Sequence, residues 1–404
     1  MTHLALPHPN AVASQPRMAA FDGLRAAAAL SVLVYHVCIA SALTRTGTFA
    51  PVLSELNAGV AVFFVISGCL LYLPYARALR DGGPLPDWRA YANRRALRIL
   101  PGYWVALTIL ALGPLAGWVL SPNWWRFYGL AQIYSPETLF GGLGVAWSLC
   151  VEVTFYALLP VLALLIARLS RRWKARSIIR VQAAVLATLA LVSCAVRYAL
   201  AGSLTASIPQ SGVVLASALP SFLDWFALGM VLALLASVWE SGAGTFAWTR
   251  RLGERSILCW AVAAACFVAG ALAKHGDVFL PLAGLDAHVA SGLGAALIVL
   301  PAVAPEHAGA PHGVVRLLRH PLALWLGAIS YGIYLWHVPV LEAIHGSLTP
   351  SPLQHSSPAA VAGLLVAVIA GAVAFGAASW YLVEQPAKRL FTRKRKPAPV
   401  IVNA

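Results

Sequence analysis

Three ionisable side chains lie within apolar stretches of the chain and have the chemistry of an acid–base site: His36, Glu152 and His337. An imidazole can take a proton from a hydroxyl group near neutral pH, and a nearby carboxylate can orient the ring and stabilise its charged form. An ionisable residue near the centre of a membrane span costs roughly 2.5–3.5 kcal/mol on insertion scales, so such a residue is a functional candidate. The sequence therefore predicts that His36 acts as a general base and that Glu152 supports it.

A second group of candidates is basic. Arg25 precedes His36 by eleven residues, close to three helical turns, so both would lie on one helix face, about 16 Å apart along the axis. Arg95 and Arg98 are three residues apart and would project from one face of another helix. Together with Arg25 they could bind a polyphosphate through forked guanidinium contacts. The alternative, which we favour for any one of these arginines alone, is a basic flank beside a membrane span.

Three further residues, together with His337, are expected to support such a site. Ser67 precedes Gly68 within an apolar helix, where close helix packing is the simpler interpretation. Tyr331 and His337 could stabilise an oxyanion, and Trp147 lies five residues before Glu152 and could contact a substrate.

The elements that must position these residues are membrane helices. The chain has 404 residues, of which 60% are hydrophobic and 11% are charged. Soluble domains have roughly 45–50% apolar and about 25% charged residues. This composition excludes a disordered chain and indicates an all-α, polytopic membrane protein.

Ten apolar segments are long enough to span a bilayer as helices. They cover residues 22–43, 57–78, 98–119, 146–168, 179–201, 219–238, 256–273, 283–303, 322–345 and 357–382. The aromatic stretch Trp124–Tyr134 is too short to span and is expected to be interfacial or re-entrant. Asp224 and Glu384, near span ends, are weaker candidates, and Glu384 is expected to pair with a nearby basic residue.

The basic residues predict the orientation, with both termini in the cytoplasm. Under this arrangement only Arg45, Arg126, Arg197 and Lys274 face outside, which leaves 25 of the 29 basic residues at the cytoplasmic face. The net charge of +15 is then explained by loops that face anionic lipid, without nucleic acid as a partner. Residues 1–20 are expected to be a disordered tail, 21–386 the membrane domain, and 387–404 a basic cytoplasmic tail.

Six short motifs occur in the order typical of one family, and the chain resembles the acyltransferase-3 family of bacterial integral membrane O-acyltransferases. The motifs are Phe21-Asp22-Gly23-Leu24-Arg25 with His36, Phe63-Phe64 with Ser67-Gly68, Arg94-Arg95 with Pro101 and Tyr103, Trp147-Ser148-Leu149 with Glu152, Phe155 and Tyr156, Ser330-Tyr331 with His337, and Val383-Glu384-Gln385-Pro386. One departure is Cys69, where an aromatic residue often follows the Ser-Gly pair. The appended hydrolase-like domain of some relatives is not expected here.

The resemblance implies transfer of an acyl group, commonly acetyl from acetyl-CoA, to a hydroxyl of a sugar or related acceptor. It implies that His36 and Arg25 are essential and that Arg95 and Arg98 contact the donor phosphates, with no metal. The expected acceptor is a cell-envelope glycan or lipid-linked sugar, reached by a multi-pass protein of the bacterial plasma membrane.

Other functions stay open from the sequence. The acceptor could be a glycosylated secondary metabolite, such as a macrolide, at the cytoplasmic side. A secondary transporter also holds charged residues at mid-depth, although the lack of a detectable repeat counts against it. The sequence leaves the acyl length, the oligomeric state and a covalent acyl-enzyme undecided.

Overall fold

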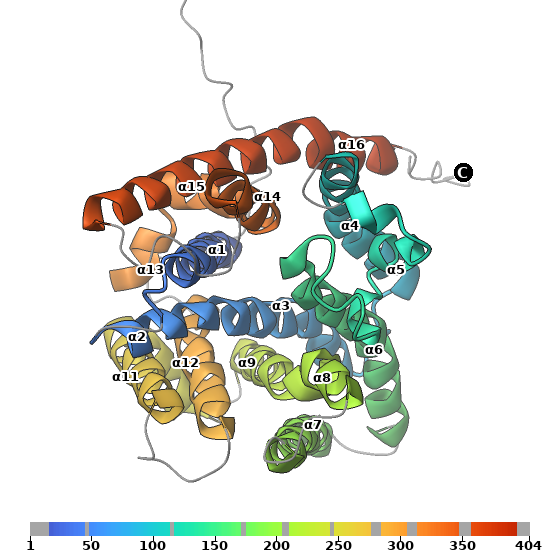
Figure 1. Ribbon diagram of the computed structural model, residues 1–404. Helices are drawn as coiled ribbons and strands as arrows, with labels where there is room; N and C mark the ends of the chain where they lie inside the picture. The colour runs from blue at the N-terminus through green and yellow to red at the C-terminus, as the bar shows by residue number, and fades with distance from the viewer. Residues whose placement is uncertain are drawn as a thin grey trace, which may run out of the picture.

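The computed structural model describes residues 16–44, 48–113, 117–170, 175–203, 210–242, 246–275, 284–304, 313–346 and 357–393. All regular elements in these residues are helical (Figure 1). They are α1 (Pro16–Ala40), α2 (Ala50–Ser54), η1 (Glu55–Ala58), α3 (Gly59–Asp81), α4 (Trp88–Leu112), η2 (Gly117–Leu120), α5 (Trp124–Tyr128), η3 (Gln132–Tyr134), η4 (Gly144–Ala146), α6 (Trp147–Ser170), α7 (Ala175–Ser203), α8 (Gln210–Ser217), η5 (Leu219–Phe222), α9 (Leu223–Glu240), α10 (Ala247–Glu254), α11 (Ser256–His275), α12 (Leu285–Val303), α13 (Gly313–Leu318), α14 (Pro321–His345), α15 (Pro358–Ser379), the π-helical turn η7 (Trp380–Glu384) and α16 (Gln385–Arg393).

Ten of these helices, or runs of joined helices, are long and apolar enough to cross a membrane, which confirms the predicted all-α, ten-span architecture. The run from α2 through α3 has 32 residues. At about 1.5 Å per residue it is longer than the ~30 Å hydrocarbon core, so it must tilt. Figure 1 shows this tilt: α3 and α15 are seen lengthwise, whereas α1 and α7 are seen almost end-on.

Helical structure continues past both predicted boundaries of the membrane domain. Helix α1 begins at Pro16, inside the segment predicted as a disordered tail, and α16 continues to Arg393, inside the predicted basic tail. The remainder of both predicted tails, residues 1–15 and 394–404, lies outside the described residues, as does Arg45.

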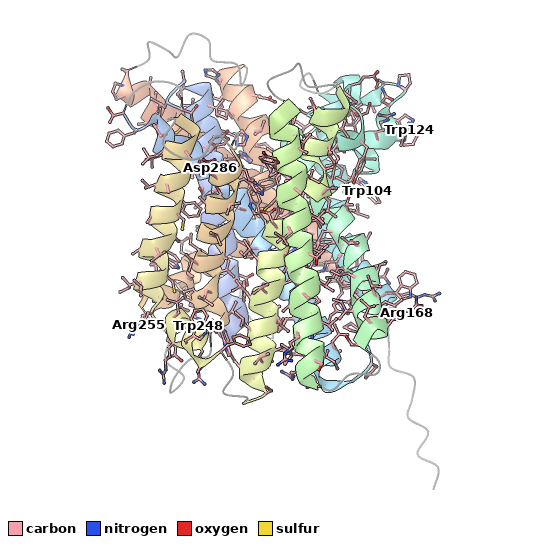
Figure 2. All side chains as sticks on the ribbon, turned by 90° about the horizontal axis from the view of Figure 1, so that it is seen from below. Trp104, Trp124, Arg168, Trp248, Arg255 and Asp286 are labelled. Carbon is pink, nitrogen blue, oxygen red and sulfur yellow. The ribbon has the colours of Figure 1, made fainter. Side chains whose placement is uncertain are left out.

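The helix bundle has two distinct ends. Figure 2 shows Arg168 and Arg255 at one end and Trp124 and Asp286 at the other. We call the first the basic end; there Arg77 at the end of α3 forms an ion pair of 2.7 Å with Glu240 at the end of α9. Between the ends, outward-facing apolar side chains are exposed on the surface that lipid would cover, among them Leu191, Val268 and Val366.

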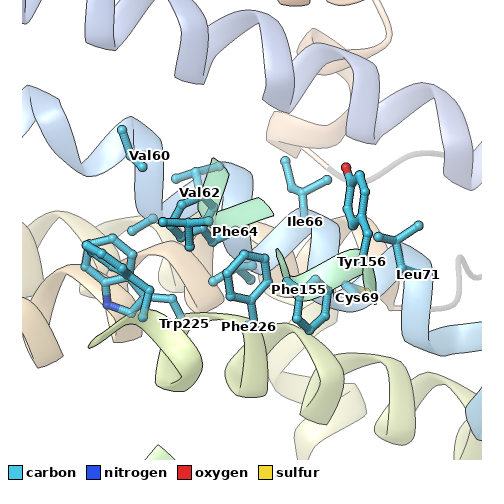
Figure 3. Close-up of a cluster of buried hydrophobic side chains, with 14 of the residues drawn as sticks. Val60, Val62, Phe64, Ile66, Cys69, Leu71, Phe155, Tyr156, Trp225 and Phe226 are labelled. Carbon is cyan, nitrogen blue, oxygen red and sulfur yellow. The ribbon is translucent and has the colours of Figure 1, made fainter. Parts of the chain in front are cut away.

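Helices α3 and α9 form the tightest contact of the core. Gly68 lies against the carbonyl of Phe226, and Gly229 lies against the backbone of α3, so closely that a Cβ atom at either position would overlap. Small residues allow membrane helices to approach in this way. The rings of Phe64 and Phe155 stack on Phe226 at 4.6 and 4.0 Å (Figure 3). The packing interpretation of Gly68 therefore holds, and α3 is firmly anchored on α9.

Helix α6 begins in the middle of the bundle and not at its surface. Ser148, in its first turn, is 2.7 Å from the hydroxyl of Tyr334, which lies halfway along α14. The connection from α4 to α6 folds back into the bundle, where Val119, Phe127 and Ile133 are fully buried. The aromatic segment expected to be interfacial or re-entrant belongs to this connection. The start of α6 therefore brings its first residues to mid-depth.

Candidate active site

A narrow cavity of about 60 Å³ lies between α1, α3, α4, α6 and α14. We call it the arginine cavity because Arg25, Arg95 and Arg98 line it, together with Ser67 and Glu152. With Tyr331, which also lines it, the structure brings together six of the residues predicted from the sequence. They come from five helices, and the α3–α9 packing and the mid-depth start of α6 position two of these helices.

The three arginines make this cavity electropositive. Arg25 bonds Asp22 at 2.9 Å, and its side chain is only 12% exposed. The guanidinium of Arg95 lies 6.0 Å from the centre of the Tyr156 ring, and its Nε atom is buried without a hydrogen-bond partner among the described residues. A buried guanidinium nitrogen without a partner is costly, and an anionic ligand would satisfy it.

Glu152 lies in the same cavity, where its carboxylate accepts a hydrogen bond from the hydroxyl of Ser67. Tyr156, one turn further along α6, lines the same wall. The Ser67–Glu152 pair therefore forms a polar patch inside the cavity that the three arginines line.

His36 lines a second and wider cavity of about 660 Å³, which we call the histidine cavity. It opens toward the end of the bundle opposite the basic end, since Ile39 and Glu342, near the ends of α1 and α14, also line it. Its walls combine aromatic rings and polar groups, including Trp147 and Asn57. This mixture suits an amphipathic ligand larger than an acyl group.

His36 contacts His337 through one nitrogen of each ring. His36 Nδ1 lies 2.9 Å from the carbonyl of Val32, and His337 Nδ1 lies 2.8 Å from the carbonyl of Tyr334. Because carbonyl oxygens only accept, both Nδ1 atoms carry hydrogen. His337 Nε2, 3.2 Å from His36 Nδ1, is then an acceptor. This leaves Nε2 of His36 with a lone pair, which is what a general base requires.

The pairing of His36 with Glu152 that the sequence suggested differs from the structure. Glu152 lines the arginine cavity and bonds Ser67, whereas His36 lines the histidine cavity and contacts His337. The reason is the depth at which α6 begins. Counted from the membrane surface, Glu152 would lie in the same half as His36, but α6 starts at mid-depth and carries Glu152 toward the basic end.

Two other predicted residues, His337 and Tyr331, already have hydrogen-bond partners within the protein. His337 is fully buried and both of its ring nitrogens are engaged, so it has no N–H left for an oxyanion. The hydroxyl of Tyr331 lines the arginine cavity but donates to the carbonyl of Ile99 at 2.7 Å. The hydrogen of each side chain already has an acceptor in this geometry, and the oxyanion role of these two residues stays a prediction.

The remaining predicted residues lie around the two cavities. Trp147 lines the histidine cavity, with its ring 5.4 Å from that of Phe222. Glu384 lies 3.8 Å from Lys388, the basic neighbour expected for it. Asp224 is buried and lines neither cavity; it bonds Ser193 and His288 on α7 and α12, as suits a structural tie between helices. The described residues hold no group of three or more His, Cys, Asp or Glu side chains that could bind a metal.

Sequence reasoning missed Tyr334 and Val60, the two residues that line both cavities. Tyr334 had a detectable signal, because it precedes His337 by three residues and so shares its helix face. Val60 had none, since nothing distinguishes it from the other apolar residues of its helix.

The chain is similar to known proteins over most of its length. The model of a family described as "Acyltransferase domain" matches residues 18–377. A Rhizobium leguminosarum bv. viciae protein, Nodulation protein 10, is 29% identical over 92% of this chain and 94% of its own length. The exopolysaccharide production protein ExoZ of Rhizobium meliloti (strain 1021) is 28% identical over 84% of this chain and 92% of its own length.

A more local similarity joins the chain to a longer protein. A Staphylococcus aureus (strain MSSA476) protein with the provisional name O-acetyltransferase SAS0844 is 30% identical over 39% of this chain, which is 26% of that protein. No solved structure matches the fold at a significant level.

Proposed function

From its membership of the acyltransferase-3 family, which makes this chain a multi-pass membrane acyltransferase, we propose that it moves an acetyl group from acetyl-CoA to a hydroxyl of a cell-envelope glycan or lipid-linked sugar. The observation that supports the proposal most is that the site consists of two adjacent cavities with different chemistry. Cationic groups for a phosphorylated donor line one cavity, and a histidine poised as a base lines the next.

The arginine cavity is the proposed donor site. Arg25, Arg95 and Arg98 would hold the phosphates of CoA by forked, charge-assisted hydrogen bonds. This agrees with an orientation in which the basic end and both termini face the cytoplasm of a bacterial plasma membrane, where CoA is available. The thioester would then extend between Tyr331 and the Ser67–Glu152 pair toward the histidine cavity.

His36 is the proposed catalytic base. Its Nε2 atom would take the proton of the acceptor hydroxyl as that oxygen attacks the thioester carbonyl; the new C–O bond forms, the C–S bond breaks, and His36 returns the proton to the departing thiolate. The charge that His36 carries between these two transfers would be stabilised by its Nδ1–H bonds to Val32 and His337.

The histidine cavity is the proposed acceptor site. Sugars bind proteins by stacking on aromatic rings and by hydrogen bonds to polar side chains, and Tyr35, Trp147, Asn57 and Glu342 supply both kinds of group. Its position at the end opposite the basic end supports an envelope acceptor over a cytoplasmic metabolite. ExoZ, similar to the chain over nearly its full length, is named for exopolysaccharide production.

Two measurements test this function. Purified protein in lipid nanodiscs, given radiolabelled acetyl-CoA and membrane glycan extract, should transfer label to the glycan fraction. Mass spectrometry of surface glycans and lipids from cells with and without the gene should show a loss of acetyl groups without it. An unchanged glycan and lipid profile, with no label transferred, would contradict the proposal.

A further inference from the structure

The arginine and histidine cavities are adjacent, because two residues line both of them. Of all the residues that line them, Val60 on α3 and Tyr334 on α14 are common to both. The direct path of an acyl group from a donor in the first cavity to an acceptor in the second therefore runs between these two side chains.

Tyr334 is held in place on one side of this path. Its hydroxyl lies 2.7 Å from Ser148 Oγ and 3.3 Å from the carbonyl of Val145. Its ring meets Phe63 edge-on at 5.7 Å, and the whole residue is only 6% exposed. With both the hydroxyl and the ring engaged, Tyr334 cannot move aside without breaking these contacts.

Val60 is held equally firmly on the other side. It lies in the first turn of α3 and is 4% exposed. One residue before it, Gly59 lies so close to the backbone of Ala28 on α1 that a Cβ atom there would overlap. Further along α3, Gly68 packs against the backbone of α9, and Gly229 of α9 packs against the backbone of α3. Because packed helices do not deform continuously, α3 cannot back away to widen the gap.

We propose that Val60 and Tyr334 form an aperture that selects the length of the acyl chain, so that acetyl passes and longer saturated chains are excluded. This inference rests on the proposed function, because it names the acyl class which that function uses. A rigid apolar wall discriminates one methylene group by roughly 10–200-fold.

The first test compares acetyl-, propionyl- and butyryl-CoA as donors in nanodiscs. Wild-type kcat/KM should fall at least tenfold from acetyl to butyryl. Val60→Ala should reduce that preference about tenfold or more, while transfer from acetyl-CoA continues. The matched control is Val62→Ala on the same helix, since Val62 is equally buried but lines an apolar groove on the opposite face; its donor preference should equal that of wild type.

A second variant and a binding measurement complete the test. Tyr334→Phe keeps the ring but loses the hydrogen bond to Ser148, and it should also broaden the donor range. Calorimetry with the unreactive thioethers S-ethyl-CoA and S-butyl-CoA should show that the wild type prefers the shorter chain and that Val60→Ala loses this preference.

The results of these experiments distinguish a failure of the aperture from a failure of the proposed acyl-transfer function. Transfer with an unchanged acetyl-to-butyryl ratio in both Val60→Ala and Tyr334→Phe would overturn the aperture and leave the function standing. Absence of transfer from every donor would overturn the proposed function, and the thioether titration would still decide whether the aperture selects chain length.

Discussion

His337 Nε2 accepts a hydrogen bond from His36 Nδ1 across 3.2 Å. This bond joins α1 to α14 through two histidines that are 301 residues apart in the chain. The other ring nitrogen of His337, Nδ1, donates to the carbonyl of Tyr334 on the same helix. The His337 ring therefore cannot rotate toward the histidine cavity or away from His36 without breaking a hydrogen bond. His36 keeps one nitrogen for a ligand, and His337 keeps none. His36 therefore has the free nitrogen that a reaction requires, and His337 positions the His36 ring.

Replacement of His36 by alanine should lower the rate of acyl transfer by about 10²–10⁴-fold, the usual contribution of a positioned general base. The KM for acetyl-CoA should change little, because the arginine cavity lies apart from His36. Transfer of radiolabel in nanodiscs measures both. His345→Ala, at the end of α14 and outside both cavities, is the matched control. Wild-type rates in a well-inserted His36→Ala protein would contradict the role of His36.

His337 should behave as a positioning residue. His337→Leu removes the acceptor for His36 and should reduce kcat by about 10²-fold with an unchanged KM for the donor. His337→Gln, whose amide oxygen can still accept from His36, should recover a large part of kcat. A purely structural role would make both variants unstable and would show no recovery with glutamine, so thermal unfolding of both variants should accompany the kinetics.

Arg98→Ala should raise the KM for acetyl-CoA with little effect on kcat, because its expected partners are donor phosphates distant from the reacting atoms. A hydrogen bond to a charged group contributes about 1.5–3 kcal/mol, which corresponds to a rise of roughly 10–100-fold. Arg95→Ala should act in the same way. Arg94→Ala is the control, since Arg94 is exposed on the same helix and does not line the cavity. An equal KM in all three variants would remove the phosphate role.

Gly68→Ala should destabilise the protein by about 1–3 kcal/mol, the usual effect of overpacking, because the new Cβ atom would overlap the carbonyl of Phe226. Gly363→Ala is the control: it lies within α15 with open space around it, and alanine there should be neutral or slightly stabilising. Thermal unfolding in nanodiscs measures both. Equal unfolding temperatures would show that α3 and α9 can separate at little cost, which would also weaken the argument for a rigid aperture.

The sequence alone determined the ten spans, and it identified Arg25, His36, Ser67, Arg95, Arg98 and Glu152 as candidates. It could do so because spans are set by a local property, the transfer of about 20 successive side chains into lipid. A charged residue within such a stretch is conspicuous for the same reason, so its type and position reveal a candidate before any contact is known.

Only the tertiary structure decided how these residues are grouped. Hydropathy does not report the depth at which a helix begins, because a connection buried among other helices satisfies its backbone within the protein and can start a helix at mid-bilayer. The start of α6 shows this: Ser148 bonds Tyr334 in the middle of α14, so Glu152 meets Ser67 and not His36. The pairing of His36 with His337 and the aperture at Val60 likewise depend on packing between helices distant in sequence, which no local pattern encodes.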